Sequence, residues 1–124
     1  MKLGETRAKV RIYGPNGSAE IELFVDTGAT LTKIPESVAR KLDLIPRRTV
    51  RVELADGRRV LRPLTFAEIE YDNVRAPVQV LIGSDGEEAL MGLTALENLA
   101  LKVNPLEQRL ERATFKEYAS VLGS

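Results

Sequence analysis

Short turn signals divide most of this chain into segments in which apolar and polar residues alternate. Asn16-Gly17, Asp56-Gly57 and Asp72-Asn73 each separate two such segments, which is the pattern of β-hairpins joined by tight turns. Strands that follow one another at such short intervals predict a sheet that folds over or closes on itself. A chain of 124 residues with 44% apolar residues suits one modest core, so we expect a single domain over 1–124.

Each expected hairpin has definite strand limits. The pairs are 8–13 with 18–25, 49–55 with 58–64, 65–71 with 74–82, and 101–103 with 106–110. A two-residue turn at Asp56-Gly57 would set Val52 opposite Leu61 and fix the register of the second hairpin. Pro77 cannot donate a ladder hydrogen bond, which favours an edge position or a bulge there.

The segments in which apolar residues recur at helical spacing are short. We expect one helix over 36–42, with Pro35 as a plausible first residue, and another that starts at a capping box, Thr94 to Glu97, and buries Leu96 and Leu99. Over 113–124 apolar residues again recur at helical spacing, which is compatible with a docked helix or a free tail.

Composition removes several classes of function. The chain has no Cys and no His, which excludes disulfides, thiol catalysis, a Ser-His-Asp triad and zinc sites built on those ligands. Its 18 basic residues equal its 18 acidic residues, so overall charge suggests neither nucleic acid nor a membrane as a partner. No apolar run approaches the roughly 18 residues of a membrane span, and we expect a cytoplasmic protein.

Asp26 is the residue with the clearest chemical potential. The apolar run Leu23 to Val25 should draw the backbone into the core and carry this carboxylate partly out of water, which is costly unless the group is used or paired. Thr27 can donate a hydroxyl hydrogen bond, and Gly28 allows close approach of another chain or a ligand. The plain alternative is an Asp that merely starts a turn after a strand.

Two segments carry a family resemblance. The first, 24–32, resembles the catalytic loop of retropepsin-like aspartic proteases, and Ala89-Leu90-Met91-Gly92-Leu93 resembles the second signature of that family, which passes beside the loop and leads into a short helix. The resemblance extends over about 8–110 and is closer to single-domain cellular members from bacteria and archaea than to viral enzymes. It implies an all-β fold: a small closed β barrel with one or two short helices.

The resemblance also implies half of an active site. Peptide hydrolysis by carboxylates needs two of them sharing one proton, and this chain has one such loop, so we expect a symmetric homodimer that acts on a peptide or unfolded protein without metal or cofactor. Asp26 would be catalytic, and Thr27 and Gly28 would support the loop across the dimer. Met91 and Gly92 would pack behind it. The expected substrate contacts come from the loop and from a mobile flap, and they are Ala29, Thr30, Ala55, Asp56, Gly57 and Arg58.

The chain departs from viral members in two places. Viral enzymes pair an acidic residue with an Arg where this chain has Thr30 and Leu93, and their Gly-rich flap is replaced by a more basic hairpin. The alternative function is therefore a catalytically weak or inactive module for dimerisation or peptide binding. Six Arg between positions 47 and 62 fit either the solvated outer face of a hairpin or a surface that selects acidic peptides. Interleaved aromatic residues are missing there, which disfavours nucleic acid.

Overall fold

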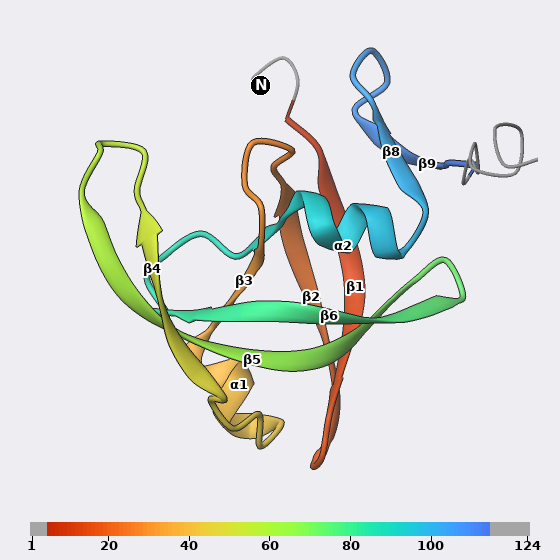
Figure 1. Cartoon of the computed structure of the whole chain (residues 1–124). Helices are drawn as coiled ribbons and strands as arrows, with labels where there is room; N and C mark the ends of the chain where they lie inside the picture. The colour runs from red at the N-terminus through yellow and green to blue at the C-terminus, as the bar shows by residue number, and fades with distance from the viewer. Residues whose placement is uncertain (1–4, 115–124) are drawn as a thin grey trace, which may run out of the picture.

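Strands dominate the computed structural model, which describes residues 5–114 (Figure 1). The main sheet contains β1 (Arg7–Gly14), β2 (Gly17–Val25), β3 (Thr32–Pro35), β4 (Arg48–Glu53), β5 (Arg59–Tyr71), β6 (Val74–Gly83) and β7 (Leu90–Met91). A separate two-stranded sheet pairs β8 (Leu101–Asn104) with β9 (Arg109–Arg112). The two helices of the described part are α1 (Glu36–Lys41) and α2 (Leu93–Asn98).

The seven strands of the main sheet follow the order β1-β2-β7-β3-β6-β5-β4. β1 also pairs with β5, where Ile12 lies opposite Ile69, so the sheet folds back on itself as the closely spaced turns predict. Its inner face buries an apolar core with the help of α2. Core side chains with no exposed surface include Ile12, Leu23, Ile34, Ile69, Met91 and Leu99. Within residues 5–114, neither helix is long and apolar enough to cross a membrane.

Two of the expected hairpins form with tight turns. β1 and β2 pair through Gly14 and Gly17, which leaves only two residues between them, two fewer than the expected connection at 14–17. β5 and β6 pair through Tyr71 and Val74, and Asp72 and Asn73 between them both have positive φ, at 52° and 65°. This is the backbone of a two-residue turn whose twist matches that of the strands, as the sequence predicts.

Pro77 occupies an edge, as expected. It lies opposite Glu68 in an unbroken β5–β6 register, while β3 pairs with β6 only from Val80 onward. The Pro77 carbonyl oxygen accepts a hydrogen bond from the Asn98 side chain, at 2.9 Å. Because the nitrogen and oxygen of one strand residue point to the same side, the missing N–H of Pro77 faces outward and costs the sheet no ladder hydrogen bond.

The hairpin of residues 48–64, called the flap hairpin below, forms with a register different from the prediction. Its loop has three residues rather than two, because Leu54 N–H donates to the Arg58 carbonyl at 2.7 Å and Gly57 N–H donates to the Leu54 carbonyl at 2.9 Å. Gly57 has a φ of 87°, the left-handed conformation that the last residue of a three-residue hairpin loop adopts. Val52 therefore lies opposite Val60, not Leu61. A shift of one residue matters because it decides which side chains share a face.

Three further boundaries differ from expectation. α2 begins at Leu93 with Gly92 as its N-cap and without a capping side chain, so the predicted capping box at Thr94 is wrong. α1 begins at Glu36, after Pro35 rather than at it. In the last hairpin, Asn104 Oδ1 accepts hydrogen bonds from two backbone N–H groups and widens the turn, so β9 starts at 109. The tail at 113–124, for which the sequence allows either a docked helix or a free tail, falls almost entirely outside the described residues, and that question stays open.

Candidate active site

Asp26 follows the last residue of β2, at a point where three strands meet. β7 lies between β2 and β3, parallel to the first and antiparallel to the second. The loop of residues 26–31, called the Asp26 loop below, leads from β2 to β3 and therefore passes over the end of β7. This crossing is what brings the two sequence signatures together, although more than 50 residues separate them in the chain.

Backbone hydrogen bonds fix the position of the Asp26 carboxylate. Asp26 N–H donates to the Met91 carbonyl at 3.0 Å, and Ala29 N–H donates to the Asp26 carbonyl at 3.2 Å. Gly28 N–H donates to Asp26 Oδ1 at 2.9 Å. The residue is half-buried, and in the part of the chain that the structure describes its second carboxylate oxygen has no hydrogen-bond partner. One oxygen is held in place and the other remains available.

The second signature supports the loop from behind. Gly92 N–H donates to the buried hydroxyl of Thr32 at 3.1 Å. A Cβ at Gly92 would lie 2.5 Å from the carbonyl carbon and oxygen of Leu31, so only glycine allows the two segments to pass this closely. Met91 is fully buried beneath the loop. Both residues pack as the sequence predicts.

The start of α2 holds the far side of the same loop. Leu93 N–H donates to the Ala29 carbonyl at 2.8 Å. Thr94 donates twice to the Thr30 carbonyl, from its N–H at 3.1 Å and from its hydroxyl at 2.9 Å. The Thr94 hydroxyl is thus engaged with the Asp26 loop rather than with its own helix. Sequence reasoning treated Thr94 only as a cap and gave no role to Thr32.

The structure brings together some of the predicted site residues and not others. Residues 26–30 form one loop, with Thr27, Gly28 and Thr30 exposed and Ala29 half-buried. The flap residues 55–58 are exposed at the hairpin tip, which extends toward the same end of the molecule as the Asp26 loop in Figure 1. Among residues 5–114, no hydrogen bond or ion pair joins the tip to the loop. No group of three or more acidic residues in that range could hold a metal ion.

Comparison with known proteins agrees with this geometry. Residues 10–98 match the family model described as gag-polyprotein putative aspartyl protease, which covers more than half of the chain. The chain belongs to this aspartyl protease family. No curated protein matches it. Among solved structures it is similar to the EIAV protease complexed with the inhibitor HBY-793, with a TM-score of 0.63 and 18% sequence identity over 81% of this chain and 92% of that one. This second likeness establishes the retropepsin-like fold.

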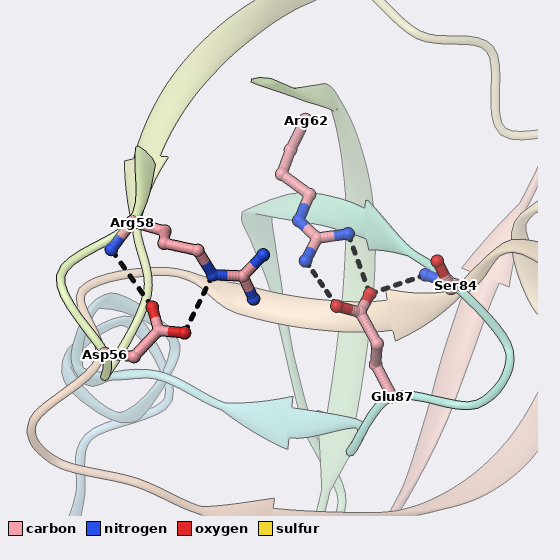
Figure 2. Close-up of polar contacts among 5 residues, drawn as sticks. All are labelled: Asp56, Arg58, Arg62, Ser84 and Glu87. Carbon is pink, nitrogen blue, oxygen red and sulfur yellow. Dashed lines mark hydrogen bonds and ion pairs between the residues drawn. The ribbon is translucent and has the colours of Figure 1, made fainter. Parts of the chain in front are cut away.

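The flap of this aspartyl protease family member has a charged tip. Asp56 accepts two hydrogen bonds from Arg58, from the backbone N–H at 3.0 Å and from Nε at 2.7 Å (Figure 2). These two bonds, the backbone one first, lower the pKa of Asp56. The predicted flap residues therefore form a closed polar turn in which Arg58 already has an acidic partner.

A second ion pair joins the base of the flap hairpin to the loop that precedes β7. Arg62 forms a two-point contact with Glu87, in which Nη1 donates to Oε1 at 2.7 Å and Nη2 donates to Oε2 (Figure 2). Ser84 N–H also donates to Glu87 Oε1, at 2.7 Å. Arg62 most strongly, then the Ser84 N–H and the Lys33 charge, lower the pKa of Glu87 against the opposing effect of burial. Sequence reasoning did not single out this pair.

The Arg62–Glu87 pair predicts a pH-dependent contribution to stability. The folded pKa of Glu87 lies below its ordinary value of 4.5, so the ionised carboxylate stabilises the fold above that value and the contribution is lost as the pH falls through the folded pKa. We expect Glu87→Gln to lower the free energy of unfolding by about 2 kcal/mol at neutral pH, because Arg62 is only 12% exposed and would lose its counterion. Denaturant unfolding across pH measures the difference, which should shrink below pH 4.5.

The matched control for this prediction is Glu97→Gln. Glu97 is exposed on α2 and makes no ion pair within residues 5–114, so its replacement should change stability by less than about 0.5 kcal/mol at any pH. Stability curves that coincide for the two variants at every pH would show that the Arg62–Glu87 contact contributes nothing.

Proposed function

We propose that this protein is an aspartic endopeptidase whose active site is completed by a second copy of the chain. The observation that carries the proposal is the Asp26 loop itself. It is braced by β7 and α2, it holds one carboxylate oxygen through Gly28, and it leaves the other open. Such bracing fixes the position of the side chain, which is what a catalytic group requires.

One carboxylate cannot act as acid and base at once, so the proposal requires a symmetric homodimer. Thr27 and Gly28 are exposed in the single chain, and a Cβ at Gly28 would meet only Asp26 Oδ1, at 3.2 Å. Leu93, beside Ala29, is an apolar residue with 41% of its surface exposed. A two-fold axis near Gly28 would cover these groups and set the two Asp26 side chains together.

In the proposed dimer the two Asp26 carboxyl groups share one proton, because two carboxyl groups within hydrogen-bonding distance of each other cannot both be ionised. The ionised carboxylate takes a proton from a water molecule as the water oxygen bonds to the peptide carbonyl carbon. The protonated carboxyl group donates its proton to the carbonyl oxygen. The tetrahedral intermediate then collapses: the carboxyl group that took the water proton gives it to the nitrogen, and the C–N bond breaks. The other carboxylate takes a proton from one hydroxyl of the intermediate, so the dyad again holds one proton. The flap hairpin would cover an extended peptide or unfolded protein segment during these steps.

The proposal is tested with purified protein and a reduced, denatured polypeptide between pH 4 and 7. We expect discrete fragments by mass spectrometry, inhibition by a statine-type transition-state analogue, and a dimer by sedimentation at micromolar concentration. Peptide binding without any cleavage would instead support a binding module. A protein that stays monomeric at that concentration would contradict both functions.

A further inference from the structure

The strand register shows which side chains share a face of the sheet with Asp26. Phe24 on β2 lies two residues before Asp26, which directly follows that strand and still pairs with Met91. Alternate residues of an extended chain point to the same side. Paired residues on neighbouring strands also share a side, so one row of side chains crosses five strands. The row consists of Phe24, Leu90, Lys33, Leu81 and Leu64. Leu64 and Leu81 are buried but lie outside the main core cluster, which confirms that this row is on the opposite face from the core.

The same face continues along β5 into the flap hairpin. Arg62, Val60 and Arg58 precede Leu64 at intervals of two residues, and Val52 lies opposite Val60. In Figure 2, Arg58 and Arg62 point to the side of the hairpin on which Glu87 lies. The opposite face of the hairpin carries the alternate residues of the ladder, which are Thr49, Arg51, Glu53, Arg59, Leu61 and Pro63. Of the six Arg between positions 47 and 62, Arg51 and Arg59 therefore point away from the Asp26 side, whereas Arg48, Arg58 and Arg62 lie on it.

Lys33 is a positive charge on the Asp26 side that has no ion-pair partner within residues 5–114. A Cβ at Gly83 would lie 2.8 Å both from Glu87 Oε1 and from Lys33 Cδ, so the missing side chain makes room for these two groups. Glu87 uses both of its oxygens on Arg62. Lys33 lowers the pKa of Glu87 from a distance and forms no direct ion pair within residues 5–114. Two cations thus meet a single carboxylate on a half-buried surface.

We propose that Lys33, positioned beside the Arg62–Glu87 pair, forms a subsite for an acidic side chain of the bound peptide. The inference rests on the proposed protease function and names a substrate class for it: segments that carry Asp or Glu near the cleaved bond. The substrate carboxylate supplies the second negative charge that this cluster lacks. Arg62 is already satisfied by Glu87, so the lysine ammonium is the group that meets the substrate.

The spacing of the strands sets where the acidic residue lies in the peptide. β3 is two strands from β2, neighbouring strands are about 4.8 Å apart, and Phe24 and Asp26 are about 7 Å apart along the extended chain. The backbones of Lys33 and Asp26 are therefore about 12 Å apart, which equals roughly three to four residues of an extended peptide. An acidic side chain about three residues from the cleaved bond reaches the subsite.

The test separates binding from cleavage. The Asp26→Asn protein, which should bind without cutting, is used to select from a random heptapeptide library, and the wild-type protein is used to cleave a proteome-derived peptide library. Both experiments are repeated with proteins that also carry Lys33→Gln or Lys33→Glu. The matched control is Lys41→Glu, because Lys41 is exposed at the end of α1 and undergoes the same change of charge.

We expect Asp and Glu to be enriched about fivefold or more over Gln at one position of the bound and cleaved peptides. Lys33→Gln should remove the enrichment, Lys33→Glu should replace it with Lys and Arg, and Lys41→Glu should leave it intact. Bound or cleaved peptides without acidic enrichment, or with an enrichment that survives Lys33→Glu, would overturn the subsite. If the wild type still cleaves, the protease function is left standing. Acidic enrichment among bound peptides without cleavage by the wild type would support the subsite and contradict the protease. A protein that retains no peptide would contradict both.

Discussion

Asp26→Asn is expected to reduce the rate of peptide cleavage by about a thousandfold or more, because an amide can neither accept the proton of the attacking water nor share a proton with its partner. The side chain keeps its size, and its oxygen can still accept the hydrogen bond from Gly28 N–H, so the loop should keep its shape. Unfolding temperature and dimer mass should be unchanged. Cleavage of a fluorogenic peptide by the purified variant measures the loss.

Mixing subunits tests whether both copies of Asp26 are needed. When the Asp26→Asn chain is added to a fixed amount of wild type and the subunits exchange, random pairing puts part of the wild-type chains into mixed dimers. With equal amounts, the activity per wild-type chain should fall to about one half and should keep falling in proportion to the wild-type fraction. Activity that is indifferent to added variant would mean that a single chain carries the whole site.

Gly92→Ala should have the largest effect on folding. Its Cβ would lie 2.5 Å from backbone atoms of Leu31, and backbone cannot move aside as a side chain end can. We expect the free energy of unfolding to fall by about 3 kcal/mol and the unfolding temperature by roughly 10 °C. Because this crossing supports the Asp26 loop, cleavage should be lost together with stability.

Gly86→Ala provides the comparison within the same segment of chain. Nothing lies within 4 Å of a Cβ at Gly86 and its φ is not in the left-handed region, so this variant should be as stable as wild type or slightly more stable. Thermal unfolding of the two variants side by side isolates the contact from the general effect of removing a glycine. Equal stability for both would show that the crossing of β7 and the Asp26 loop is looser than the backbone positions indicate.

Local signals account for the part of the fold that sequence reasoning predicted. Turn residues and alternation identified the hairpins, and an Asp after three apolar residues identified the end of β2, because these features depend on neighbours in the chain. The register of the flap hairpin was wrong because it depends on one dihedral angle, the φ of Gly57. Two-residue and three-residue turns share the same Asp-Gly signal. They differ in which residue of β5 shares a face with Val52: Leu61 for the shorter turn and Val60 for the longer one.

Apart from the packing of Met91 and Gly92 behind the Asp26 loop, which the family resemblance implied, contacts between distant segments could not be predicted. Arg62 and Glu87 are 25 residues apart, and nothing in either neighbourhood distinguishes them from the many exposed charges of the chain. Thr94 and Thr32 looked like ordinary helix and strand residues, and their roles follow only from the crossing of the two signatures. The position of Lys33 also follows only from the strand register, which places it on the Asp26 side of the sheet.

The insertion of β7 between β2 and β3 also has a consequence in time. The groups that steady residue 26 come from positions 91 to 94, and a ribosome delivers these residues only after about three quarters of the chain has emerged. A shorter nascent chain has the carboxylate but lacks the contacts from β7 and α2. Under the proposed function, such a chain would not yet hold Asp26 in the position that cleavage requires.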